Sequence, residues 1–200
     1  VYKRQGVETP KNWSQLATDI VTSKYFRKAG VPETGREISA RQLIQRVTRT
    51  VRRAGESFGG YFATPEDAKT FEAELTHILI TQRGSFNSPV WFNSGLWHEY
   101  GIEGSGGNFF WDSDTASVQK TENAYEHPQN SACFIQSVDD SLESMLELQK
   151  SEVRLFKYGS GTGSNFSRVR AKGEALQGGG ASSGVLSFLE GFDRWAGSIK

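Results

Sequence analysis

The stretch QNSACFIQSVDDSLESMLELQKSEVRLFKYGSGTGSNFSRVR, residues 129–170, decides the fold of this 200-residue chain. It contains a short apolar run, then a helical pattern, then a turn of small residues. Cys133, the only cysteine of the sequence, lies in the apolar run. A strand, a helix and a glycine-rich turn in succession are typical of an α/β domain, and small residues let backbone N–H groups approach an anion. The stretch therefore predicts an α/β domain with a pocket for an anionic ligand.

The first two elements of this stretch have simple local signals. Residues 131–138 are predicted to form a strand, because the apolar run around Cys133 is bounded by polar residues. A helix is predicted to begin at residues 139–141, Asp-Asp-Ser, with apolar positions at helical spacing up to Phe156. The aspartates have two interpretations: they cap the helix, worth about 1 kcal/mol, or Asp140 accepts hydrogen bonds from a sugar hydroxyl. The spacing leaves both open.

Two turns are rich in glycine, residues 158–165 (YGSGTGSN) and residues 178–184 (GGGASSG). Neither has the Gly-Lys-Ser/Thr ending of a phosphate-binding loop, and the first does not match the dinucleotide fingerprint. After the first turn, residues 164–170 alternate like a strand, which would place Arg168 and Arg170 on one face. The second turn precedes a predicted helix whose first backbone amides favour a phosphate. Taken alone, such turns are more often loops than binding sites.

The first part of the chain is predicted to be helical. Residues 13–29 form a weak helical or mixed segment. Ser39 followed three residues later by Gln42 is a capping-box pattern, and apolar residues on one helical face follow it. This helix is expected to stop before Gly55, since glycine weakens a helix interior.

The next helix is predicted to begin after Thr64 as N-cap, with Pro65 in its first turn, and to run to about residue 82. Residues 89–92, Pro-Val-Trp-Phe, lie between polar pairs and are expected to be a buried strand or a tight turn. Residues 96–128 are expected to be a long loop with several embedded aromatic residues. Such a loop is either a lid or binding loop, or a packed surface excursion without a ligand.

The formal net charge is +0, but its distribution is uneven. Residues 1–60 are rich in Lys and Arg, whereas residues 61–150 are rich in Asp and Glu. The basic segment has no interleaved aromatic residues and no recognisable nucleic-acid motif, so we expect a solvated helix face that meets the acidic middle of the chain rather than a nucleic-acid site. The arginines of this face are Arg41, Arg46, Arg49, Arg52 and Arg53.

Other classes of protein are excluded by what the sequence lacks. It has no run of about 18 apolar residues, so no membrane helix is expected. The histidines His77, His98 and His127 have unrelated contexts, and no metal site is expected. With a single cysteine and no signal-peptide pattern, a reducing cytoplasmic location is expected.

Four segments in fixed order resemble the class II, adenosylcobalamin-dependent ribonucleotide reductases. The resemblance extends from about residue 13 to the end of the chain, and it is strongest after residue 83. Four ordered motifs are a far more specific signal than any one glycine pattern. They are NSPVWFN (residues 87–93), HPQNSACFI (residues 127–135), LFKYGSGTGSNFSRVR (residues 155–170) and GGGASSGVLSFL (residues 178–189).

The resemblance implies a helical N-terminal region, residues 1–85, followed by the first portion of a ten-stranded α/β barrel, residues 86–200. It implies a radical reduction of ribonucleotides to deoxyribonucleotides for DNA synthesis. In that family, adenosylcobalamin supplies an adenosyl radical, and a cysteine thiyl radical then takes the ribose 3′ hydrogen. A pair of cysteines supplies the reducing equivalents and becomes a disulfide.

The resemblance also implies roles for individual residues. Cys133 matches the first cysteine of the redox pair. Two further sets of positions match the substrate site and the effector site of the family. In the effector set, Asp140 would bind a ribose and Arg170 a phosphate. The substrate set is Ser88, Ala132, Cys133, Gly161 and Gly163, and the set for a dNTP allosteric effector is Asp140, Ser141, Leu142 and Arg170.

The family pattern requires residues that this sequence does not contain. The second redox cysteine and the thiyl cysteine have no counterpart, because Cys133 is the only cysteine. The chain is therefore expected to be an N-terminal fragment that is inactive by itself. The family further implies a thioredoxin-type reductant and a homodimer, and residues 96–128 are the candidate for cobalamin contacts. A diphosphate and a triphosphate substrate both stay open.

Two alternatives to this function stay open at the level of the sequence. One is a non-catalytic nucleotide-binding or assembly module in which Cys133 is an inert core thiol. The other is a glycyl-radical ribonucleotide reductase, which strict dependence on adenosylcobalamin in air would exclude.

Overall fold

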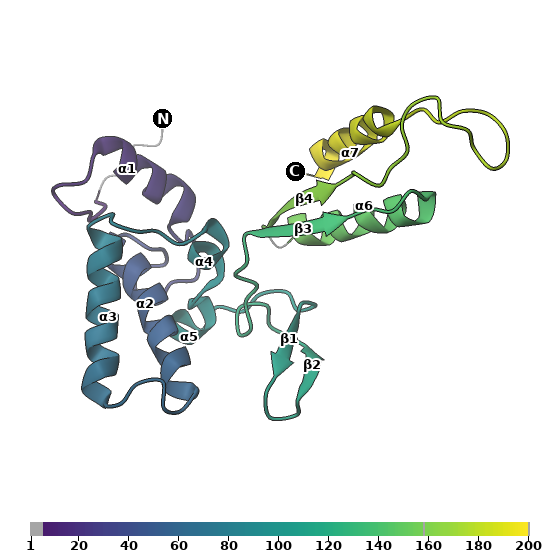
Figure 1. Ribbon diagram of the computed structural model, residues 1–200. Coiled ribbons are helices and arrows are strands. Elements are labelled where there is room, and N and C mark those ends of the chain that lie inside the picture. The colour runs from purple at the N-terminus through teal and green to yellow at the C-terminus, as the bar shows by residue number, and fades with distance from the viewer. Residues whose placement is uncertain (1–5, 158, 200) are drawn as a thin grey trace. The chain divides into compact units, whose positions relative to one another are not determined.

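The computed structural model describes residues 6–157 and 159–199. The chain divides into two compact units, Val1–Asn130 and Ser131–Lys200 (Figure 1). The division between residues 85 and 86 expected from the sequence lies inside the first compact unit. As an assignment of family domains, that division stays a prediction.

The first unit is mainly helical (Figure 1). Its only described sheet is an antiparallel hairpin, in which Trp111 is opposite Val118. Its elements are α1 (Gln15–Ile20), the π-helix η1 (Val21–Tyr25), α2 (Ala40–Ser57), α3 (Pro65–Ile80), α4 (Ser88–Asn93), α5 (Leu96–Tyr100), β1 (Phe109–Asp112) and β2 (Ser117–Lys120).

Capping explains where the two long helices begin. Ser39 and Gln42 form the predicted capping box at the start of α2. Thr64 accepts a hydrogen bond from the Asp67 N–H and caps α3, which confirms the second predicted start. The expected end of α2 is wrong, because the helix continues through Gly55 to Ser57. A Cβ atom at Gly55 would lie 2.7 Å from the Phe62 ring, so this glycine permits close packing rather than ending the helix.

The core of the first unit lies between α2, α3 and α4. Its buried residues come from α2, α3, α4 and the residue that follows η1. The short helix α4 is therefore stabilised by packing against the two long helices. Trp91 of α4 is the largest of them, and its indole N–H donates to the Phe86 carbonyl oxygen at 3.0 Å. The buried cluster consists of Phe26, Leu43, Ile44, Val47, Leu79 and Trp91.

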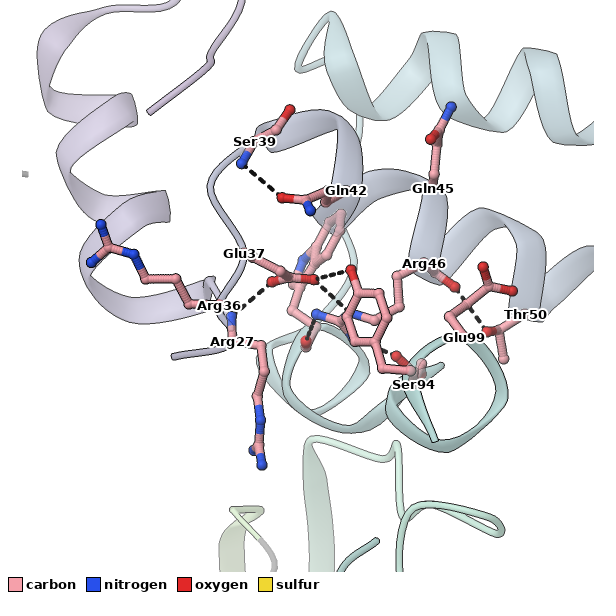
Figure 2. A network of polar contacts seen from close by, with 12 residues as sticks. Arg27, Arg36, Glu37, Ser39, Gln42, Gln45, Arg46, Thr50, Ser94 and Glu99 are labelled. Atoms are coloured by element: carbon pink, nitrogen blue, oxygen red, sulfur yellow. Dashed lines mark hydrogen bonds and ion pairs between the residues drawn. The ribbon is translucent and has the colours of Figure 1, made fainter. Parts of the chain in front are cut away.

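Arg46 is the residue of α2 that departs most from the sequence-based expectation. Its side chain is buried, not solvated, and it pairs with the buried Glu37 (Figure 2). The expected contact with the acidic middle of the chain is confirmed for Arg49, Arg52 and Arg53, which pair with Glu72 or Glu99. Arg52 Nε lies 2.7 Å from a Glu72 oxygen. Arg53 Nη1 lies 2.7 Å from a Glu99 oxygen.

Two local predictions for residues 86–130 are corrected by the structure. Residues 89–92 lie in the helix α4 and not in a strand or turn, because proline is compatible with the first turn of a helix. Residues 96–128 contain α5 and the hairpin β1–β2, so they are not a structureless loop. The hairpin turn is closed by Asp112, whose carboxylate accepts hydrogen bonds from the Thr115 hydroxyl at 2.7 Å and the Asp114 N–H at 3.1 Å. These bonds hold the pKa of the Asp112 carboxyl below its usual value, and the bond from Thr115 has the largest effect.

The second unit is a strand–helix–strand arrangement followed by a further helix (Figure 1). β3 (Cys133–Ser137) and β4 (Gly161–Asn165) are parallel, and α6 (Leu142–Lys157) connects them. α7 (Val185–Ile199) confirms the last predicted helix. The buried core of this unit is Val138, Met145, Leu148, Val169 and Phe192.

The strand β4 begins earlier than the sequence predicted. It occupies Gly161–Asn165, and residues 166–170 form a turn in which the Val169 N–H donates to the Phe166 carbonyl oxygen at 3.0 Å. Arg168 and Arg170 therefore do not share a strand face, and that prediction is wrong. The position of β4 is set by its pairing with β3. This pairing forms although the glycines of β4 have low strand propensity.

Within residues 6–157 and 159–199, no helix has the length and apolar character needed to cross a bilayer. Over the same residues, no three His, Cys, Asp or Glu side chains are grouped so that they would hold a metal ion.

Candidate functional site

One face of the β3–β4 pair presents the thiol, and we call it the thiol face. It consists of Cys133 and Ile135 from β3 and Gly161 and Gly163 from β4, which are direct register partners. Cys133 is a free, exposed cysteine. A Cβ atom at Gly161 would lie 3.9 Å from Cys133 Sγ, so glycine at this position keeps the space beside the thiol open.

The backbone holds the first residues of the two strands together. The Gly161 N–H donates to the Ala132 carbonyl oxygen at 2.6 Å. A Cβ atom at Gly163 would lie 3.1 Å from Ile135 Cδ1, a tighter contact than at Gly161. The structure thus brings four of the five predicted substrate residues together: Ala132, Cys133, Gly161 and Gly163.

The opposite face of β4 is fixed to α6 by a buried carboxylate. Glu152 Oε1 accepts hydrogen bonds from the Thr162 hydroxyl at 2.9 Å and the Ser164 hydroxyl at 3.2 Å. Successive strand residues point to opposite faces, so these contacts leave the thiol face uncovered by α6. Sequence reasoning missed Glu152. Its signal was its spacing, because Met145, Leu148 and Glu152 are the buried residues of α6 and recur at helical intervals.

The four predicted effector residues line one cavity, which we call the loop pocket. Its volume is about 430 Å³, within the range of small-molecule sites. It lies between the start of α6, Arg170 and the segment that leads to α7. The lining residues are Asp140, Ser141, Leu142, Met145, Arg170, Leu176, Gln177, Ala181, Ser182, Ser183 and Phe188.

The charged groups of the loop pocket are paired with each other. Arg170 Nε lies 2.5 Å from Asp140 Oδ2, and the Arg170 backbone N–H donates to Asp140 Oδ1 at 3.3 Å. Outside the pocket, Arg168 Nη1 lies 2.6 Å from Asp139 Oδ1. The two carboxylates are therefore bonded to arginines, and the interpretation of both as helix caps is wrong. Ser141 supplies the cap, since its hydroxyl oxygen accepts from the Ser144 N–H at 3.2 Å.

Ser88, the fifth predicted substrate residue, belongs to the first unit. It is the first residue of α4 and is half-buried. Its hydroxyl oxygen lies 3.1 Å from the Tyr25 hydroxyl oxygen. Sequence reasoning missed Tyr25, because it lies in the weak segment of residues 13–29 and matches no motif.

Comparisons with known proteins assign the chain to a family. Residues 1–82 match the family model described as class II vitamin B12-dependent ribonucleotide reductase, and residues 131–200 match that of the ribonucleotide reductase barrel domain. A vitamin B12-dependent ribonucleotide reductase from Rhodopirellula baltica is 48% identical over 200 residues, which are 100% of this chain and 19% of that protein. The chain belongs to the class II, vitamin B12-dependent ribonucleotide reductase family.

One further relative and one solved structure also match the chain. A vitamin B12-dependent ribonucleoside-diphosphate reductase from Thermoplasma acidophilum is 41% identical over 73 residues, which are 36% of this chain and 10% of that protein. The solved structure of the Actinobacillus ureae class Id ribonucleotide reductase alpha subunit has a TM-score of 0.54 and 17% identity, and the match covers 94% of this chain and 26% of that one. At this identity the likeness shows the fold alone.

These findings confirm the predicted fold class for this member of the reductase family. The second unit is the opening part of the reductase barrel, and the two strands among its described residues do not close a barrel by themselves. The chain spans about a fifth of the length of the Rhodopirellula relative, as its 19% coverage states. The resemblance found in four sequence motifs is confirmed as well.

Proposed function

We propose that the protein containing this chain reduces ribonucleotides to deoxyribonucleotides for DNA synthesis, with Cys133 as one half of its redox pair. The observation that supports this role is the exposed thiol of Cys133 beside Gly161, a position without a side chain. A ribose needs close approach to the sulfur, and a glycine opposite the thiol permits it.

In this proposal Cys133 supplies one of the two thiols that reduce the ribonucleotide. The ribose C2′–OH bond breaks, the hydroxyl leaves as water, and a C2′–H bond forms. Two thiols lose two protons and two electrons and become a disulfide, which balances the reaction. This sequence contains one cysteine, so the second thiol comes from outside residues 1–200, and the chain alone does not turn over. A thioredoxin-type reductant then restores both thiols.

The proposed substrate is a ribonucleoside diphosphate or triphosphate, and Ala132, Cys133, Gly161 and Gly163 of the second unit are proposed to bind it. Ser88 of the first unit is assigned to the substrate by the family resemblance alone. The name of the Thermoplasma relative favours the diphosphate. A 2.6 Å hydrogen bond joins the backbone at Gly161 to that at Ala132. These positions are therefore fixed relative to each other, which suits them to hold the ribose. We place the reaction in the cytoplasm, as expected from the sequence.

The loop pocket is proposed to bind a dNTP effector that tunes substrate preference. Its two charged residues offer complementary chemistry, since the Arg170 guanidinium binds a phosphate and the Asp140 carboxylate accepts from a ribose hydroxyl. Ser141 and Leu142 complete the predicted set at the start of α6. Exposed Leu142 and Leu146 of α6 and Leu186 of α7 support a homodimer that covers these helices.

The cofactor we propose is adenosylcobalamin, which when bound supplies the radical that starts the reaction. Residues 96–128 fit part of such a group. Phe109, Trp111 and Val118 are exposed and lie on one face of the β1–β2 hairpin, where they present an apolar surface suited to a flat macrocycle or an adenine. In this proposal the hairpin holds and shields the cofactor.

The test uses the full-length protein with adenosylcobalamin, a ribonucleotide and thioredoxin. Cys133→Ser is expected to lose multi-turnover reduction while cleavage of adenosylcobalamin continues, because the radical step does not need the redox pair. Ser137→Ala, on the exposed side of the same strand, is the matched control and should turn over normally. Normal turnover by Cys133→Ser would contradict the proposal.

A further inference from the structure

We infer that Tyr25 positions the Ser88 hydroxyl as a hydrogen-bond donor toward an anionic oxygen of the nucleotide substrate. This inference rests on the proposed function, because it concerns the substrate site to which Ser88 is assigned. Tyr25 is 63 residues from Ser88 in sequence, yet their hydroxyl oxygens lie 3.1 Å apart. Tyr25 is a positioning residue here, since it acts through Ser88.

Tyr25 contacts α4 at two points. Its hydroxyl meets Ser88 at the start of the helix, and its ring stacks on Phe92 with centroids 5.3 Å apart and planes 18° apart. Residues four apart lie on the same side of a helix, so Ser88 and Phe92 present one face to Tyr25. The stack fixes the ring, and the ring in turn fixes where the hydroxyl lies.

The direction of the hydrogen bond gives Ser88 its role. A serine hydroxyl has one hydrogen to donate and two lone pairs that accept. A phenol is more acidic than an alkyl hydroxyl and is the better donor, so Tyr25 donates to Ser88 Oγ. The single hydrogen of Ser88 then remains to bond an external acceptor. Ser88 is half-buried, and a phosphate oxygen is an acceptor of the required kind.

The local backbone explains how Tyr25 reaches this place. η1 is a π-helix, and the Phe26 N–H donates to the Val21 carbonyl oxygen at 3.1 Å, five residues back. A π-turn inserts one residue relative to an α-helix and changes the direction of the side chains that follow; such turns are frequent at functional sites. Tyr25 is the last residue of η1. An uninterrupted α-helix would turn this side chain away from its present direction by about 100°.

The experiment compares steady-state kinetics of full-length holoenzymes. Tyr25→Phe removes one oxygen and keeps the ring that stacks on Phe92. We expect KM for the ribonucleotide to rise about fivefold, the equivalent of one ordinary hydrogen bond, with kcat within about twofold of the wild type. Tyr61→Phe removes an exposed tyrosine hydroxyl in the same unit and is the matched control, with KM unchanged.

A double-mutant cycle with Ser88→Ala separates positioning from general damage. Because Tyr25 acts through Ser88, Tyr25→Phe should add nothing to KM once Ser88 is alanine. Additive effects, or an unchanged KM in Tyr25→Phe, would overturn the inference while Ser88→Ala still tests the substrate site. A wild-type holoenzyme that reduces no ribonucleotide would overturn the proposed function and this inference together.

Discussion

Two arginine–carboxylate pairs, one in each unit, have similar geometry and opposite surroundings. Arg46 Nε lies 2.8 Å from Glu37 Oε1 in the first unit, and Arg170 Nε lies 2.5 Å from Asp140 Oδ2 in the second. The side chains of the first pair are 1% and 0% exposed, whereas those of the second are 28% and 29% exposed. The first pair is therefore part of a core, and the second is part of a pocket wall.

The buried pair is enclosed by other hydrogen bonds (Figure 2). Arg46 also donates to the carbonyl oxygens of Trp91, at 3.0 Å, and Ser94. Glu37 accepts from the Tyr100 hydroxyl at 2.9 Å and from the Arg27 N–H at 2.7 Å. A buried charge is tolerated when every group around it is bonded, and removing one partner leaves the other uncompensated.

The pocket pair is open on one side, so its groups can exchange partners for a ligand. This difference teaches that the same chemical pair stabilises the fold where water is excluded and stays accessible to a ligand where water has access, as the proposed effector site requires. Substitutions should follow the same division: in the first unit they should change stability, and in the second they should change the response to a ligand.

The largest effect is expected for Arg46→Met. The substitution leaves the Glu37 carboxylate buried without its cation, which typically costs about 3–5 kcal/mol. Urea unfolding followed by circular dichroism measures this loss. Arg41→Met is the matched control on the same helix, because the side chains of Arg41 and its partner Glu8 are exposed, and a change below about 1 kcal/mol is expected. Equal stabilities for the two variants would show that the enclosed network is unimportant.

A smaller effect with a defined pH dependence is expected for Tyr100→Phe. It removes the donor to Glu37 and should destabilise the protein by about 1 kcal/mol at neutral pH. Burial, then the nearby Glu37 charge, raises the pKa of Tyr100 above its ordinary value of 10.0. Above that value the unfolded chain releases the phenol proton while the folded protein retains it, so the contribution of Tyr100 is complete below pH 10 and falls as the pH rises.

The measurement is the difference in unfolding free energy between wild type and Tyr100→Phe from about pH 8 to pH 11. Titration of lysines is common to both proteins and cancels in this difference. The difference should be constant up to about pH 9.5 and then shrink. A difference that stays constant throughout would contradict the raised pKa.

The smallest effect on stability is expected for Asp140→Asn. The pair with Arg170 is partly solvated, so the loss should be below about 1 kcal/mol. In the full-length enzyme, however, the dependence of substrate preference on added dNTP should disappear. Asp139→Asn is the matched control, since its pair with Arg168 is exposed and lies outside the loop pocket. An intact dNTP response in Asp140→Asn would remove this residue from the effector site.

Local signals in the sequence predicted the elements that depend on local interactions. The capping residues Ser39 and Thr64 gave the starts of α2 and α3, and the apolar run around Cys133 gave β3. The helix α4 was missed, because an apolar run of four residues has too little periodicity to separate helix from strand. The register of β4 was missed for another reason. Its hydrogen bonds go to β3, and no property of residues 161–165 alone specifies them.

The sequence predicted part of the candidate site and missed the residues whose partners are distant in the chain. The motifs grouped Cys133 with Gly161, and Asp140 with Arg170, and the structure places each pair in contact or register. The burial of Arg46 was not predicted, because its partner Glu37 precedes the helix and helical periodicity does not include it. The role of Tyr25 was not predicted either, because its partner Ser88 is 63 residues away and no local pattern connects them.

The parallel pairing of β3 with β4 also has a consequence for the order of folding. These strands cannot meet through a tight hairpin, since α6 and its flanking turns separate them. A helix of this length forms in about a microsecond, much faster than non-local strands pair. We therefore expect α6 to form first and the environment of Cys133 to be completed late. Pulsed hydrogen exchange during refolding tests this order: the backbone amides of α6 should gain protection before the Gly161 N–H, which donates across the strand pair to Ala132, and equal or earlier protection of the Gly161 amide would refute it.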